Sequence, residues 1–366
     1  MIDYEYFERP SPLLNEVGAR IVRELHRVLS SPELSLSPEL KFSLNRSFAA
    51  CSPVLLNHLG LLDEIPAFKT NGKLASQFSY EIAMIKRLLT NELKVKELLS
   101  GDNQLIVDLV FAILISDVGK AGVMEAVENQ PSLVIQRIFN QAIFTDAHKE
   151  WLKKAKPTDF PDQIRELIEE LPEVDRKNIF EKGIFFSLPI EAYLYVIKQV
   201  ALGLAKNNAD LTDKAENLFT LTKGEQEFLL SIGVDPIKTP MRSFFTNSHI
   251  RFGRIFLNDG NLLNNEQKEM APLALSHHLS QGVLPKGTDI DLFLNDQQLL
   301  RKAAFLEILD KFDAFYSRFK ENDCVAARES TWKIISSNLK SNYGQYPELV
   351  DVYKEIFDSM VGSEII

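Results

Sequence analysis

The chain has 366 residues, of which 41 are lysine or arginine and 51 are aspartate or glutamate, so its formal net charge is −10. This acidic balance argues against a protein that coats nucleic acid or binds membranes through a polybasic surface, because both functions need cationic side chains. Hydrophobic residues make up 45% and charged residues 25%, which is typical of a globular protein of one or two domains.

Cysteine usage and the first residues favour a cytoplasmic protein. Cys51 and Cys324 stand in no metal or redox spacing, so we predict buried thiols in a reducing compartment. The segment Met1 to Glu8 carries acids where a secretory signal would carry a basic start. The most apolar stretch, Leu105 to Ile115, is well short of the roughly 20 residues that span a bilayer. We therefore expect no membrane partner.

Apolar residues recur at three- and four-residue spacing along most of the chain, which predicts an all-α protein. Helix-start signals support this fold class: a serine precedes a proline at Ser37-Pro38, and Thr222 with Glu225 has the spacing of a capping box, as does Asn264 with Gln267. In chain order, the predicted helices are 13–29, 39–58, 77–99, 104–116, 125–144, 162–171, 190–206, 224–232, 241–257, 265–281, 295–320, 325–342 and 348–360.

Four short segments carry the residues that suggest chemistry. They read SDVGK at 116–120, SHIRFGRIF at 248–256, SHHLSQGVLPKG at 276–287 and ILDKFDAF at 308–315. In this order they resemble the HD superfamily of metal-dependent phosphohydrolases, and within it the HD-GYP cyclic dinucleotide phosphodiesterases. That family has a His-Asp-Ile-Gly-Lys sequence, a lone His, a His-His pair before a Gly-Tyr-Pro loop, and a helix with a final Asp. The resemblance covers about residues 75–125 and 245–325 and implies an HD-like helical bundle.

The chain departs from the family pattern at several positions. Ser116 stands where the family has the His of its His-Asp pair, and the earlier family His falls within 78–80, where no residue binds a divalent metal well. Leu279 replaces an acid and Leu284 replaces the loop tyrosine. His58 is an alternative source of the missing imidazole, although a lone His in an apolar helix is more often bonded to a backbone carbonyl.

The resemblance implies a set of metal ligands, namely Asp117, His249, His277, His278 and Asp310. One ion would keep Asp117, His249 and either His277 or His278, whereas the other would keep only Asp117 and Asp310. Because neighbouring residues on a helix point about 100° apart, we expect at most one of the paired histidines to ligate. The alternative is that both are ordinary helix histidines. The expected cofactor is a divalent transition metal (Fe, Mn or Zn), as one ion or none, and catalysis should be weak or absent.

Basic residues near the motifs suggest how a phosphate would be held. Asp117 and Lys120 are the predicted catalytic residues, because Lys120 follows Asp117 by three positions and can reach a phosphate as a point charge. Arg251, Arg254 and Lys286 are the other predicted substrate-binding residues. The alternative for each is a solvated basic side chain.

The resemblance also predicts how the chain is organised. We expect an N-terminal helical region at 1–75, a first part of the HD-like domain at 76–150, a helical insertion at 151–240, and a second part of that domain at 241–366. The segment 153–177 is rich in charge and proline, which is typical of a surface excursion or a boundary, or else of an exposed helix with polar turns.

Two functional hypotheses follow. The first is a degenerate HD-GYP-like phosphohydrolase, with cyclic di-GMP or another cyclic dinucleotide as the implied substrate. The second is a catalytically inactive HD-like signalling domain that binds a nucleotide or a protein partner. Under either hypothesis the expected ligand is a small phosphate compound, and no nucleic-acid polymer is expected to bind.

Overall fold

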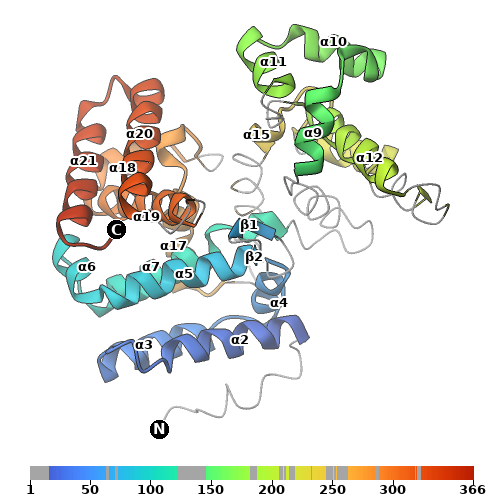
Figure 1. The fold of residues 1–366 in the computed structure, drawn as a ribbon. Coiled ribbons are helices and arrows are strands. Elements are labelled where there is room, and N and C mark those ends of the chain that lie inside the picture. Colours follow the sequence, from blue (N-terminus) through green and yellow to red (C-terminus); the bar gives the residue numbers. More distant parts are fainter. Residues whose placement is uncertain are drawn as a thin grey trace. The chain divides into compact units, whose positions relative to one another are not determined.

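The structure, a computed structural model, divides the chain into two compact units. Unit 1 comprises Met1–Met124 and Ile250–Ile366, and unit 2 comprises Glu125–His249. Both units are mostly helical (Figure 1). The structure describes residues 16–62, 66–70, 73–121, 146–181, 188–205, 209, 212–213, 219–231, 233–244, 250, 253, 263–284, 288–317, 319 and 323–366.

The first half of unit 1 is organised around one buried helix. Its elements are α2 (Glu16–Leu29), α3 (Pro38–Ala49), α4 (Pro53–Leu62), β1 (Pro66–Thr70), β2 (Lys73–Ser76), α5 (Gln77–Thr90), α6 (Glu92–Leu98), α7 (Asn103–Ser116) and the 3-10 turn η1 (Val118–Ala121). Helix α7 contacts α3, α5 and α6, and every residue from Leu105 to Ser116 is buried. An apolar helix covered on all sides is a core helix, so α7 carries its C-terminal end into the interior.

The second half of unit 1 packs on the same core. It contains α17 (Asn265–Ala274), the 3-10 turn η5 (Leu279–Gln281), α18 (Asp291–Asn295), α19 (Gln297–Tyr316), α20 (Cys324–Tyr343) and α21 (Pro347–Gly362). Helix α17 contacts α7, while α19 contacts α5, α7, α20 and α21. Phe305 and Phe312 of α19 are fully buried. Segments far apart in the sequence therefore share one core, which brings Asp117, His277 and Asp310 into one region.

The helix-start signals in the sequence are confirmed. Ser37 Oγ accepts a hydrogen bond from Leu40 N at 3.2 Å, which caps α3. Asn264 and Gln267 form both bonds of a capping box at the start of α17. Thr222 forms the equivalent pair of bonds with Glu225. These side chains satisfy backbone N–H groups that have no partner within the first helical turn.

Two long predicted helices are each divided in the structure, so those predictions were wrong. The helix expected at 39–58 splits into α3 and α4, because Pro53 has no N–H to continue the helical ladder and Ser52 caps the new helix. The helix expected at 77–99 splits at Asn91, because the side-chain amide of Asn91 donates a hydrogen bond to a backbone carbonyl of α5. The helix expected at 125–144 and most of that at 241–257 lie outside the described residues.

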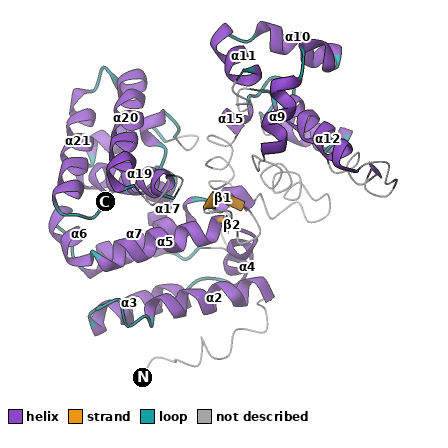
Figure 2. Cartoon of the chain, in the orientation of Figure 1, coloured by secondary structure: helices purple, strands orange, loops and turns teal. Residues whose placement is uncertain are grey.

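A short antiparallel hairpin is the one departure from helix and turn among the elements of unit 1 that the structure describes (Figure 2). Strands β1 and β2 pair Lys69 with Leu74 and Thr70 with Lys73. The sequence predicted no strand here. The dipeptide Asn71-Gly72 between the strands is a strong hairpin signal and would have revealed it.

Unit 2 is a smaller helical body with an aromatic core. Its described elements are α9 (Asp146–Lys154), η3 (Pro157–Asp159), α10 (Asp162–Glu170), α11 (Glu173–Phe180), α12 (Ile190–Ala205), α14 (Lys223–Ser231) and α15 (Met241–Ser243). Phe160 lies 5.8 Å from Trp151, 6.2 Å from Phe180 and 5.7 Å from Tyr195, measured between ring centroids. This cluster joins α9, α11 and α12. The predicted insertion at 151–240 falls within unit 2, and its boundaries stay a prediction.

No single helix in the described ranges is long and apolar enough to cross a membrane, although Glu92–Leu98 and Asn103–Lys120 pass that test together as a bent pair, by length and composition only. Both cysteines are free. Cys51 is buried as predicted, whereas Cys324 is only partly buried, because it occupies the exposed first turn of α20.

Candidate functional site

Asp117 is the residue around which the candidate site is built. It caps the C-terminus of α7 and is only 3% exposed. Its Oδ2 accepts hydrogen bonds from the Gln77 side chain and from Lys120 Nζ, the latter at 2.7 Å. Lys120 reaches back from η1, three residues further along the chain. The two predicted catalytic residues therefore form an ion pair in which Asp117 is buried and Lys120 is partly exposed.

His277 faces Asp117 from the turn that follows α17. Its Nδ1 lies 2.8 Å from Ala274 O, and because a carbonyl only accepts, Nδ1 carries the proton. Its Nε2 lies 3.5 Å from Asp117 Oδ1, and the imidazole is buried. An imidazole that donates one nitrogen to a backbone carbonyl and presents the other to a carboxylate-lined space has the orientation of a metal ligand.

The paired histidines lie on a turn, so the helix predicted at 265–281 is shorter than expected. Helix α17 contains Pro272 and ends at Ala274. Ser276 Oγ donates a hydrogen bond to Leu273 O, and His277 Nδ1 donates one to Ala274 O. These side chains therefore bond to backbone carbonyls that would accept from backbone N–H groups if the helix continued. The rings of His277 and His278 are 4.3 Å apart.

His278 has a different set of partners. Its Nδ1 lies 3.0 Å from Lys311 Nζ and 3.1 Å from Gln281 Nε2. Both of these groups only donate, so His278 Nδ1 is an acceptor. Lys311 Nζ also lies 2.6 Å from Asp310 Oδ2. The last two predicted ligands are thus joined to each other through an ammonium group.

Glu81 on α5 belongs to the same cluster and was missed by sequence reasoning. Its side chain is fully buried, and neither carboxyl oxygen has a hydrogen-bond partner among the described residues. Burial raises the pKa of Glu81 well above its ordinary value, the charges of Asp117 and Asp310 raise it further, and Lys120 opposes the rise. The signal was the single acid of the mostly apolar segment 77–90, the first part of the helix predicted at 77–99.

We predict that Glu81→Met raises the free energy of unfolding by about 1 to 3 kcal/mol near neutral pH, because methionine fills a similar volume without a carboxyl group to desolvate. A raised pKa stabilises the fold at pH values below the ordinary glutamate value of 4.5, and this contribution is lost as the pH rises. The advantage of the variant should therefore grow with pH in chemical denaturation. Glu81→Gln, which keeps polar atoms, should gain less. A less stable Glu81→Met protein at both acidic and alkaline pH would contradict the prediction.

Another buried acid, Asp313 of α19, has a cation beside it. Its Oδ1 accepts from Arg87 Nε at 2.7 Å, and its Oδ2 has no hydrogen-bond partner among the described residues. The Arg87 guanidinium also stacks near Phe312 and Tyr316. Burial raises the pKa of Asp313 to about 6, although Arg87 opposes the rise. This pair joins α5 to α19.

A second buried network supports the turn that carries the histidines. Glu307 of α19 is fully buried and accepts from Ser280 N, Ser280 Oγ and Tyr353 OH at 2.8, 2.6 and 2.7 Å. Asn342 donates to Ser280 O. Gly282 follows in the left-handed region with a φ of 73°, where a side chain would be strained and would press on Asn342. The end of η5 is therefore fixed by α19, α20 and α21.

The predicted metal ligands form two pairs in the structure, and only one of these pairs fits a metal ion. Asp117 and His277 converge with the geometry described above. Asp310 and His278 do not fit a metal ion, because the Lys311 ammonium bridges them. In the described part of the chain, no group of three or more His, Cys, Asp or Glu residues is arranged to hold a metal ion.

Several predicted site residues lie outside the described residues. These are His249, Arg251, Arg254 and Lys286. Ser116 is buried and donates to Ile113 O, so it supplies no ligand. His58 is buried in α4, as a core histidine would be.

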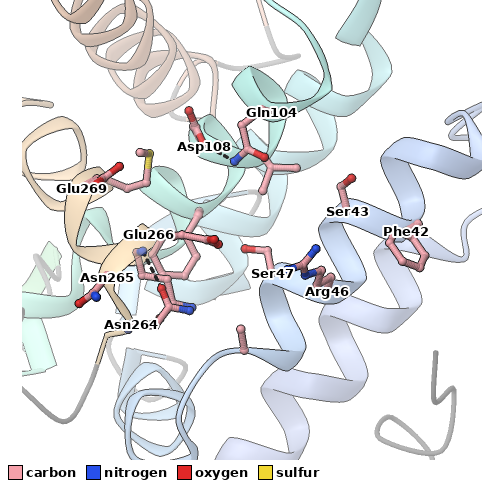
Figure 3. Close-up of a pocket in the computed structure, with 15 residues that line it drawn as sticks. Phe42, Ser43, Arg46, Ser47, Gln104, Asp108, Asn264, Asn265, Glu266 and Glu269 are labelled. Carbon is pink, nitrogen blue, oxygen red and sulfur yellow. Dashed lines mark hydrogen bonds between the residues drawn. The ribbon is translucent and has the colours of Figure 1, made fainter.

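An open groove of about 750 Å³ lies along the first half of α7 (Figure 3). Ser47 and Arg46 of α3 face Gln104 and Asp108 of α7 across it, and the start of α17 completes the wall. Asp108 and Asp117 are about 13 Å apart along the helix axis, from the rise per residue. The groove is thus separate from the Asp117 cluster, and no motif in the sequence pointed to it.

Comparisons with protein-family models, curated proteins and solved structures find no significant match to this chain. The functional interpretation therefore depends on the residues and their geometry.

Proposed function

We propose that unit 1 is a divergent HD-GYP-like domain that acts as a weak, single-metal phosphodiesterase on a small phosphate ester. A cyclic dinucleotide is the substrate class that the resemblance implies. One observation carries the proposal: His277 Nε2 lies 3.5 Å from Asp117 Oδ1. Both residues are buried, and their motifs are more than a hundred positions apart in the sequence.

The residues of this half-site have distinct proposed roles. A Zn, Mn or Fe ion held by Asp117 and His277 would lower the pKa of bound water and polarise a phosphoryl oxygen. The Ala274 carbonyl accepts the Nδ1 proton of His277, which orients the ring so that Nε2 faces Asp117. Lys120 supplies positive charge near the position where a phosphate would bind, and in the structure it neutralises Asp117.

The second hypothesis, a catalytically inactive signalling domain, is favoured by a different observation. Lys120 pairs with Asp117 at 2.7 Å, and Lys311 pairs with Asp310 at 2.6 Å, so each predicted metal-binding carboxylate already has a cation beside it. A domain of this kind would bind its nucleotide or protein partner without hydrolysis.

Metal analysis combined with a hydrolysis assay separates the two. For the phosphodiesterase, we expect about one equivalent of transition metal per chain, with both metal and cyclic di-GMP hydrolysis lost in His277→Ala. His26→Ala on α2, outside the cluster, should keep both. Calorimetric binding of cyclic di-GMP without metal or hydrolysis would favour the signalling domain. If neither metal nor cyclic di-GMP binds to the folded protein, the phosphodiesterase and the nucleotide-binding form of the second hypothesis both fail.

A further inference from the structure

Lys311 occupies an unusual position for a lysine. It is 8% exposed, and its ammonium contacts Asp310 Oδ2 at 2.6 Å and His278 Nδ1 at 3.0 Å. A buried ammonium is costly unless its charge is paired and its donors are used. Here both conditions are met by a carboxylate and an imidazole. These two groups are also the donors that a transition metal prefers.

We infer that the Lys311 ammonium is a built-in cation that takes the place of a metal ion between Asp310 and His278. Two features support the substitution. The His278 lone pair on Nδ1 points at the ammonium, so it is not available to a metal while Lys311 is present. Tyr80 OH adds a third contact to this position by bonding to the backbone oxygen of Asp310 and lying 3.3 Å from Oδ1.

The built-in cation ties two parts of unit 1 together. Lys311 and Asp310 belong to α19, and His278 belongs to the turn after α17. Tyr80 of α5 contacts Asp310 and not the ammonium group. A metal ion that bridged these groups would provide the same cross-link, but only when metal was supplied. Lys311 makes the cross-link permanent and excludes the ion. The inference uses the proposed function only to name Asp310 and His278 as predicted ligands, which the resemblance assigns to two different ions.

The inference predicts that an added metal ion rescues the loss of Lys311. The experiment uses the His277→Ala protein as parent, so that metal at Asp117 does not contribute. In EDTA-treated protein, Lys311→Met should lower the melting temperature by about 3 °C or more. Millimolar MnCl2 should return most of that loss, and bound Mn should rise about tenfold over the parent. The parent itself should not respond to MnCl2.

Lys302→Met in the same parent is the matched control. Lys302 lies on the same helix and pairs with Asp108 at 3.5 Å, away from any predicted ligand. Its loss should not be rescued by MnCl2. If Lys311→Met does not fold, the same measurements are made on Lys311→Gln, which keeps an N–H donor. The inference is overturned if the folded Lys311 variant binds no more Mn than the parent and gains no stability from it.

The experiments distinguish failure of the proposed function from failure of the Lys311 inference. Metal in the wild-type protein that depends on His277 tests the proposed function alone. Mn binding that appears only after Lys311 is replaced tests the built-in cation alone. A wild-type protein without metal, together with a Lys311 variant that Mn rescues, would reject the phosphodiesterase and retain the inference.

Discussion

Glu307→Ala is expected to lower the free energy of unfolding by about 3 to 5 kcal/mol, because it leaves three buried donors without an acceptor. These donors are Ser280 N, Ser280 Oγ and Tyr353 OH. Chemical denaturation followed by far-UV circular dichroism measures the loss. The deleted volume adds to it, since the site is fully buried.

Two controls separate the network from simple loss of volume. Tyr353→Phe removes one donor while the ring stays, and should cost about 1 kcal/mol. Glu307→Gln keeps an acceptor oxygen and should fall between the two. Hydrogen exchange at the turn 275–282 should accelerate in Glu307→Ala more than in Tyr353→Phe. Equal losses for Glu307→Ala and Tyr353→Phe would show that Ser280 contributes nothing.

Arg87→Met is expected to cost about 3 kcal/mol at neutral pH, because it leaves Asp313 buried and without its cation. The exposed part of the arginine side chain makes this less than the full cost for a deeply buried pair. Methionine retains packing against Phe312 and Tyr316, so the change reports mainly the charge. Urea denaturation at several pH values provides the measurement.

The pH dependence of this effect has a defined sign. The pKa of Asp313 is raised from 3.8 to about 6, so its contribution to stability is present below 3.8 and is lost as the pH rises towards 6. Arg87 opposes that rise, so its removal moves the pKa higher still. The deficit of Arg87→Met should therefore be larger at neutral pH than under acidic conditions. Adding Asp313→Asn should remove most of the pH dependence. A deficit that does not change with pH would contradict this assignment.

The helical class was predictable because the core is built from amphipathic and apolar helices with regular spacing. The caps at Ser37 and Asn264 were also predictable, since capping depends on neighbours in the sequence. The break at Asn91 was not predicted, because its polar side chain competes locally for a backbone group within an otherwise continuous apolar pattern. The spacing of apolar residues gives no information about hydrogen bonds between polar side chains and the backbone. The break at Ser52 was overlooked, although Ser52-Pro53 is the same helix-start signal as Ser37-Pro38.

The candidate site was predictable only in part. The motif order identified Asp117, His277 and Asp310, and the structure brings all three into one cluster, although their roles stay predictions. The resemblance gave no reason to choose Lys311. Its partners come from another segment of the chain, so its role depends on how α19 packs against the turn after α17. Glu81 was missed for the same reason, since its neighbours become visible only in three dimensions.

The core of unit 1 is assembled from two segments that leave the ribosome at different times. Helix α7 is synthesised before any residue of Glu125–His249, whereas its partner α17 is synthesised after all of them. During that interval the apolar surface of α7 has no α17 to cover it, and an exposed apolar helix is prone to aggregation. We therefore expect the core of unit 1 to be completed only after all of Glu125–His249 and the C-terminal helices have been synthesised.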